Sequence, residues 1–238
     1  MMDFCGLGAT LFNAGLPPRP ASWPRQTNVN LVEIRMLATP KLTALSADIS
    51  GHLFENPKMG VPRGVYWSCS VAFAPIPEGT DEWQCTLLCD WISWPVRSWR
   101  DIDGLTLANC TGPLQMEASL YFLGEHQMIS TIELSFHKTD MNYFRATGRL
   151  SADLTDLDGR FFRGVEAKLE VNAEFVGLRV VPDNLFPKPK SEAQASQALA
   201  NFVDLQSYEP PQWVPYEPLR SDHGAWLFRP SLVRALNQ

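Results

Sequence analysis

The chain lacks the sequence signatures of the common catalytic and membrane proteins. It contains no GxSxG, HExxH, Walker or GxGxxG motif, and its four histidines are isolated from one another. No stretch offers the roughly 18 uninterrupted apolar residues that a membrane helix needs. The first residues include an acid and no basic segment, so they do not resemble a secretory signal. These absences predict a cytoplasmic protein that is neither an enzyme nor bound to a membrane.

Basic residues are fewer than acidic ones. The chain has 20 Lys and Arg against 26 Asp and Glu, and its net charge is −6. An acidic protein repels phosphate backbones and anionic lipid, which argues against direct binding of nucleic acid or membrane surfaces. The charge suits a basic partner better.

Cysteine is scarce, and nothing in its spacing indicates a metal or redox centre. The five cysteines form no C-x-x-C pair. Free cysteines in hydrophobic runs behave as small apolar residues. The acidic turns at 101–104 and 156–159 resemble the start of a calcium loop but lack the glutamate at its twelfth position. We therefore expect neither metal nor cofactor; a thiol enzyme built around Cys69 or Cys110 is the alternative.

Alternation of apolar and polar residues dominates the middle of the chain. VEAKLEVNAEF (165–175) alternates without an exception, and FRATGRLSADL (144–154) repeats the pattern. Such alternation is typical of half-buried strands, and the turn signals between the runs favour hairpins over βαβ units. The sequence predicts a mainly β fold, an antiparallel β-sandwich or curled sheet, with a C-terminal helix and an extended tail that place it at the margin of α+β.

Three regions follow from this pattern. Residues 1–28 are predicted to form an irregular arm and residues 29–182 the antiparallel β-domain. Residues 183–238 are predicted to add a helix and an extended aromatic tail packed on that domain. The helix is expected over 191–205, capped by Ser191, and a last short helix near 230–236.

The stretch CDWISWPVRSWRDIDG (89–104) concentrates tryptophan and aspartate. Alternation places Trp91 on the inward face of a strand, while Trp94 and Trp99 fall at the strand end and in a loop. Loop aromatics beside charged residues have the composition of a protein interface. The alternatives are that Trp94 and Trp99 close the open end of a sandwich, or that exposed rings form a sugar platform.

WRDIDGLTL, EASLYFLGEHQMISTIELSF and YFRATGRLSADL carry a resemblance over about residues 83–180. Here the chain resembles small β-rich bacterial immunity proteins that accompany type VI or polymorphic toxins. Such proteins act by binding, so the resemblance implies a cognate toxin as partner and no catalytic residues.

These observations lead to a first hypothesis, an immunity or inhibitor protein that blocks a basic toxin, perhaps a nuclease, by covering its active site. A small-ligand or carbohydrate-binding β-domain is the second hypothesis. The partner-binding residues expected from the sequence are those of the aromatic loop and of one polar strand face: Trp94, Trp99, Arg100, Asp101, Asp103, Glu166, Glu170 and Glu174.

Overall fold

The computed structural model describes residues 39–78, 81–108, 116–217 and 220–232. The fold is mainly β, as the alternation predicts. One α-helix is present among the described residues, α1 (Glu192–Leu199), and it is too short to cross a bilayer. The strands are β1 (Ala44–Asn56), β2 (Val61–Glu78), β3 (Asp81–Ile92), β4 (Thr106–Ala108), β5 (Glu117–Phe122), β6 (Glu125–Asp140), β7 (Tyr143–Thr155), β8 (Phe161–Val180), β9 (Gln212–Glu217) and β10 (Arg220–Phe228).

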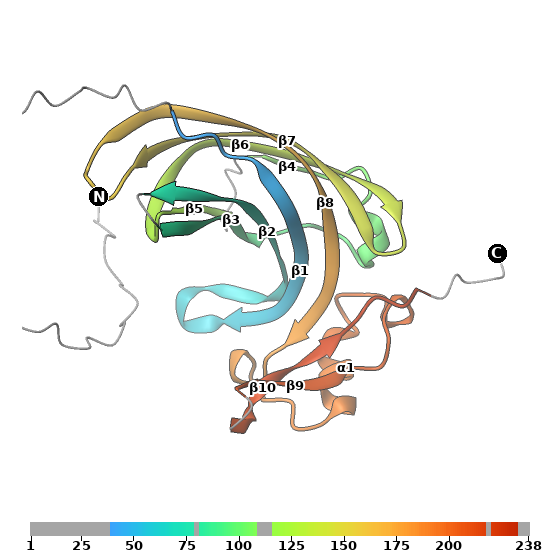
Figure 1. The fold of residues 1–238 in the computed structure, drawn as a ribbon. Coiled ribbons are helices and arrows are strands. Elements are labelled where there is room, and N and C mark those ends of the chain that lie inside the picture. The colour runs from blue at the N-terminus through green and yellow to red at the C-terminus, as the bar shows by residue number, and fades with distance from the viewer. Residues whose placement is uncertain (1–38, 79–80, 109–115, 218–219, 233–238) are drawn as a thin grey trace, which may run out of the picture. The chain divides into compact units, whose positions relative to one another are not determined.

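A single sheet closes on itself as a seven-stranded barrel, where the sequence predicted a sandwich or a curled sheet (Figure 1). Antiparallel neighbours follow the order β1-β2-β3-β5-β6-β7-β8, and β1 then pairs with β8 in parallel. The short β4 pairs with β6 outside this path. Strands of this length twist and curl, and closure removes the unpaired edges that an open sheet would expose.

The inner face of the barrel is filled by alternate side chains of every long strand. In β8, Val165, Leu169 and Phe175 are buried, while Glu166 and Glu170 between them are exposed. The same alternation holds along β7. These two strands confirm the prediction from period 2, because each presents one apolar face to the core.

One residue departs from the predicted alternation. Cys89 pairs with Cys69, but the next paired residue of β3 is Ile92, opposite Trp67, so the register shifts between them. Trp91 lies at this bulge with φ of 61°. Ile92 takes the inward position, and Trp91 packs elsewhere as a half-buried side chain. The prediction of Trp91 in the barrel core is therefore wrong, because a bulge reverses the facing of the residues that follow it.

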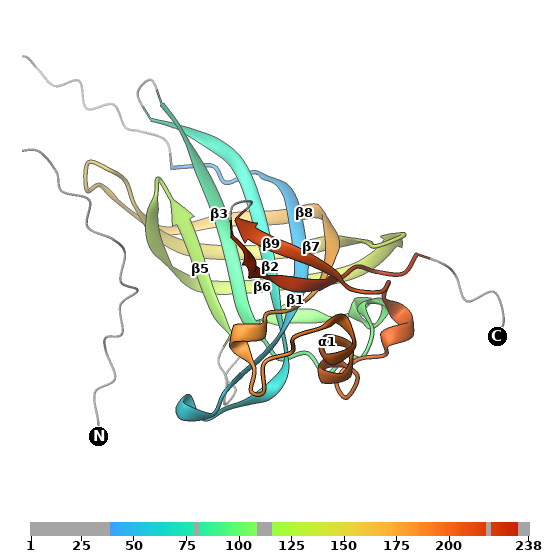
Figure 2. The same ribbon diagram turned by 90° about the horizontal axis from the view of Figure 1, so that it is seen from below.

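The C-terminal segments pack around the end of β8 (Figure 2). The Ser191 side chain caps α1 as predicted and accepts a hydrogen bond from the Gln194 backbone. The helix ends at Leu199, six residues before the predicted end, because Val203 turns into the core and the Asp204 amide donates to the Arg97 carbonyl.

The aromatic tail forms a hairpin. β10 pairs with the end of β8, and β9 pairs with β10. The ring centroids of Trp213 on β9 and Trp226 on β10 lie 5.2 Å apart. Residues 1–28, and residues 233–236 of the short helix predicted near 230–236, lie outside the described residues.

Candidate binding surfaces

The aromatic loop between β3 and β4 packs against the barrel core. It contains the 3₁₀ turn η2 (Trp99–Ile102), whose first and last residues are buried. The half-buried Trp94 ring lies 5.5 Å from Phe136 and 6.0 Å from Trp67, centroid to centroid. Both tryptophans of this loop thus contribute to the core, which corresponds to the alternative in which they close one end of the β-structure.

Trp99 is 1% exposed and joins three segments of the chain. Its ring stacks on Phe175 of β8, with planes 8° apart and centroids 6.1 Å apart. Its Nε1–H donates to the Ser207 carbonyl at 2.8 Å. The cationic groups of Arg100 and Lys138 each lie 4.5 Å from the centre of a Trp99 ring. Trp99 is therefore in no position to touch a partner directly.

Two aspartates stabilise this loop while their side chains remain exposed. Asp101 accepts a hydrogen bond from the Ser98 amide at 2.9 Å and completes a capping box at the start of η2. Asp103 accepts from the Lys138 amide at 2.9 Å and connects the loop to β6. Asp101 also accepts from the Arg97 amide at 3.3 Å, but a carboxylate has about four acceptor positions, so both side chains retain positions for contact with a partner.

A hollow of about 440 Å³, here called the Trp99 hollow, adjoins this loop. The Arg100 side chain beside it donates to the Ser231 carbonyl at 2.7 Å. Met141 and Leu232 are 60% and 49% exposed, which makes them apolar residues on an otherwise polar surface. The hollow is lined by Trp99, Arg100, Asp103, Lys138, Thr139, Asp140, Met141 and Leu232. It brings together three residues expected from the sequence and adds Lys138, Met141 and Leu232, which no sequence pattern had indicated.

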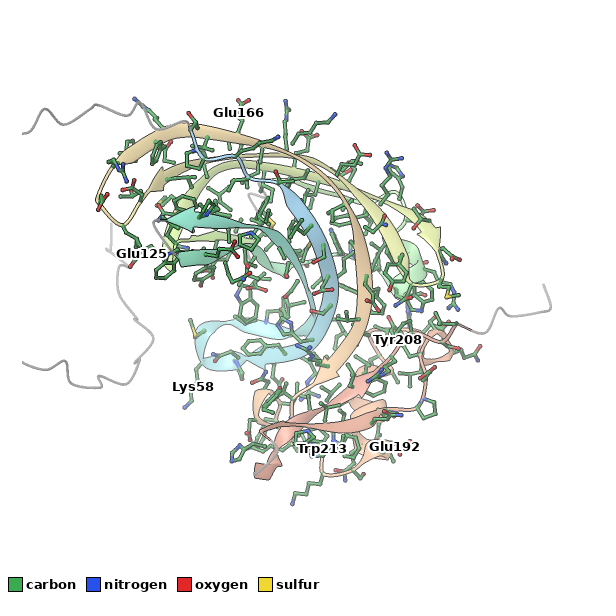
Figure 3. The ribbon with its side chains drawn as sticks, viewed as in Figure 1. Lys58, Glu125, Glu166, Glu192, Tyr208 and Trp213 are labelled. Atoms are coloured by element: carbon green, nitrogen blue, oxygen red, sulfur yellow. The ribbon has the colours of Figure 1, made fainter. Side chains whose placement is uncertain are left out.

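The predicted acidic strand face lies on the outside of the barrel, where Glu166 points away from it (Figure 3). Two of its glutamates contact residues of the neighbouring β6–β7 hairpin. Glu170 forms an ion pair with Arg145, and Glu174 accepts a hydrogen bond from the Asn142 side chain. A hollow of about 580 Å³ crosses the same face, and Arg149 and Lys168 line it together with Glu166. Basic side chains are thus interspersed with the predicted glutamates on this face.

An aromatic cluster that no sequence pattern indicated lies on the outer face of β1, β2 and β3. The ring centroids of Phe54, Tyr66 and Trp91 lie 4.9 to 6.3 Å apart, and His52 lies 5.4 Å from Trp91. We call these four residues the ring cluster. Pairing of His52 with Tyr66 across β1 and β2 aligns two of its members. The bulge in β3 brings Trp91 to them, and no alternation pattern could have predicted that.

Opposite charges act on His52 in the ring cluster. Burial lowers the pKa of His52, the Asp90 carboxylate raises it, and the Arg179 guanidinium lowers it. Arg179 is paired with His52 in the parallel register of β1 and β8, and its side chain is exposed. An anion on β3 and a cation on β8 therefore both act on the cluster.

The described cysteines are poor nucleophiles. Cys69, Cys85 and Cys89 all point into the barrel and are at most 1% exposed. Burial raises the pKa of Cys69 and of Cys85 to about 12, and raises the pKa of Cys89 well above its ordinary value. Because the thiolate is the reactive form, these side chains are unsuited to thiol chemistry. Cys5 and Cys110 lie outside the described residues.

We expect these three thiols to resist alkylation until the barrel unfolds. Iodoacetamide at pH 8, followed by peptide mapping, should modify the peptides containing Cys69, Cys85 and Cys89 only after denaturant is added. Because the pKa of these thiols is higher in the folded chain than in the unfolded chain, the free energy of unfolding should fall as the pH rises above about 8.5. In that range the thiols ionise in the unfolded chain but stay protonated in the folded one. Rapid labelling of any of the three in the native protein would contradict their burial.

No metal site or catalytic constellation is evident among residues 39–78, 81–108, 116–217 and 220–232. In these ranges, no group of three His, Cys, Asp or Glu side chains could hold a metal ion. One Ser–His contact exists: His126 Nε2 lies 2.9 Å from Ser119 Oγ on the outer face of β5 and β6. An activated serine also needs a group that orients the histidine and donors for an oxyanion, and the His126 ring has only the Tyr121 ring beside it, 5.7 Å away.

No family model, curated protein or solved structure matches this chain.

Proposed function

We propose that this protein is a non-catalytic immunity or inhibitor protein that binds a basic protein toxin and covers its active site. The observation that carries the proposal is the Trp99 hollow. Its two exposed apolar side chains, Met141 and Leu232, share the lining with the exposed carboxylates Asp103 and Asp140 and with the cationic side chains of Arg100 and Lys138. Apolar anchors within a charged rim are the usual composition of a protein interface.

The rigidity of the hollow supports binding. Trp99 underlies it, while Asp103 and Arg100 connect the loop to β6 and to the C-terminal segment. A surface held in place before association loses less conformational entropy when a partner binds. The net charge of −6 would accelerate encounter with a basic toxin, and added salt would slow it. The toxin is thus the partner that best fits both the charge and the preformed surface.

The test compares two exposed methionines near opposite ends of β6. Met141 borders the Trp99 hollow, whereas Met128 is 77% exposed near the start of the strand. The tagged full chain and its Met141→Asp and Met128→Asp variants would be used to capture proteins from the native host, and the captured toxin would then be purified. We expect Met141→Asp to weaken binding by about 30-fold, corresponding to roughly 2 kcal/mol, with Met128→Asp unchanged.

Inhibition must accompany binding. The purified toxin should lose its enzymatic activity on addition of the wild-type chain and of Met128→Asp, but keep it with Met141→Asp at the same concentration. The proposal fails if no protein is captured at any salt concentration, if Met141→Asp binds as well as the wild type, or if the captured protein remains active when bound.

A further inference from the structure

The ring cluster groups three aromatic side chains and a histidine on the outer face of the barrel. The ring planes of Phe54, Tyr66 and Trp91 are inclined to one another by 66° to 79°, so the rings pack edge to face, and the Phe54 and Trp91 side chains remain half-exposed. Tyr66 is buried although it belongs to no part of the barrel core. The faces of aromatic rings carry negative charge, and a ring face that is open to solvent attracts alkylated ammonium groups.

The position of Trp91 carries a conformational cost that the barrel does not require. A bulky residue at φ of 61° is strained, by roughly 1 to 3 kcal/mol for such conformations. The barrel core gains nothing from this side chain, because Ile92 fills the inward position. The bulge instead brings the indole to within 5.4 Å of His52 and 4.9 Å of Phe54.

Two opposite charges border the ring cluster. Asp90 precedes Trp91 on β3, and Arg179 lies beside His52 across the β1–β8 pair. Both groups act on His52, with opposite signs. Within the described ranges, neither Asp90 nor Arg179 forms a salt bridge. The 57% exposed Tyr216 side chain is close enough to Arg179 for the guanidinium to act on its pKa.

We propose that the ring cluster binds a small zwitterionic ammonium compound, with the alkylated ammonium against the rings of Phe54 and Trp91 and the carboxylate at Arg179. A simple anion would meet the negative ring faces and Asp90. A simple cation would gain the rings and Asp90 but would leave the Arg179 charge without a partner. A compound that carries both charges complements both ends. This site goes beyond the proposed function, since it requires no protein partner and lies on other strands than the Trp99 hollow.

Isothermal titration calorimetry of the full chain with trimethylglycine tests the proposal. Tetramethylammonium chloride and sodium acetate serve as the matched probes that carry only one of the two charges. We expect trimethylglycine to bind about tenfold more tightly than tetramethylammonium, because its carboxylate adds one charge-assisted hydrogen bond with Arg179. Acetate should not bind. Absence of trimethylglycine binding in the millimolar range, or equal affinity for trimethylglycine and tetramethylammonium, would overturn the assignment.

Three variants separate the contributions of the site. Trp91→Leu should weaken both ammonium probes by at least about tenfold, because it removes the principal ring. Arg179→Met should reduce trimethylglycine to the affinity of tetramethylammonium and leave the latter no weaker. Lys168→Met, a base elsewhere on the outer face of β8, is the control and should change nothing. Unaltered binding by Trp91→Leu, with the fold verified by its melting temperature, would refute the site.

The pH dependence provides a second readout. Protonated His52 would place a positive charge beside the ammonium group, so affinity should fall as the pH drops through the lowered pKa of His52, below about 6.5. Asp90 and Arg179 are the charged groups that act on His52. His52→Gln should abolish this decrease above pH 5. Met141→Asp should leave trimethylglycine binding intact, so failure of the ammonium site and failure of the toxin-binding surface are distinguishable.

Discussion

Replacement of Trp99 by alanine is expected to destabilise the barrel by about 4 kcal/mol, within the range for truncation of large buried aromatic side chains. The substitution removes the ring that stacks on Phe175 and the hydrogen bond to the Ser207 carbonyl. It also removes the aromatic surface that Arg100 and Lys138 cover. Urea unfolding followed by circular dichroism would measure the loss, and a melting temperature lower by roughly 10 °C should accompany it.

Trp91→Leu is the matched control for this prediction. It also shortens a tryptophan of the same sequence stretch, but Trp91 is half-buried and lies outside the barrel core. We expect it to cost no more than about 2 kcal/mol. If Trp99→Ala instead cost less than about 1 kcal/mol and abolished toxin binding, Trp99 would be the surface anchor that its loop position first indicated.

Gly148→Ala is expected to prevent the barrel from closing. A methyl group at Gly148 would lie 1.9 Å from the Glu133 carbonyl oxygen and 2.9 Å from the Leu134 Cα atom. Both are backbone atoms of β6, so the clash cannot be relieved by a side-chain rotation. Since β7 pairs with β6 on one side and β8 on the other, separating β6 from β7 would open the barrel. We expect a loss above about 4 kcal/mol, seen as insoluble protein or a large drop in the urea midpoint.

Gly159→Asn separates this steric effect from the general cost of replacing glycine. Gly159 lies in the β7–β8 turn at φ of 77°, with nothing within 4 Å of the position that a side chain would take. Asparagine tolerates this conformation, so the cost should stay below about 1 kcal/mol. A Gly148→Ala protein as stable as Gly159→Asn would show that β6 and β7 can move apart without loss of the barrel.

The aromatic loop illustrates how far composition leads. The tryptophan- and aspartate-rich segment 89–104 contributes Trp99 and Asp103 to the lining of a hollow. Composition does not show whether a tryptophan side chain is buried beneath the surface or exposed on it. That depended on Phe175, Ser207 and Lys138, which are distant in sequence and meet Trp99 only in the folded chain. The same is true of Met141 and Leu232, whose exposure no local pattern reveals.

The polar face of β8 illustrates the opposite limit. Its alternation was read correctly, and the glutamates are on the outside as predicted. Their electrostatic character was not readable from β8 alone, because Arg145 on the neighbouring strand pairs with Glu170. An ion pair across strands depends on register, and register is set by the pairing of whole strands.

The sequence by itself determined that β7 and β8 are strands and which of their residues face inward, since a period of two is a local property of the backbone. It also determined the capped start of α1, because the capping serine contacts an amide three residues away. Only the tertiary structure decided that the sheet closes through the parallel pairing of β1 with β8, since that contact joins segments more than a hundred residues apart. It likewise decided where Trp91 points, because one extra residue at a bulge reverses the face of all that follow, and local alternation contains no sign of it.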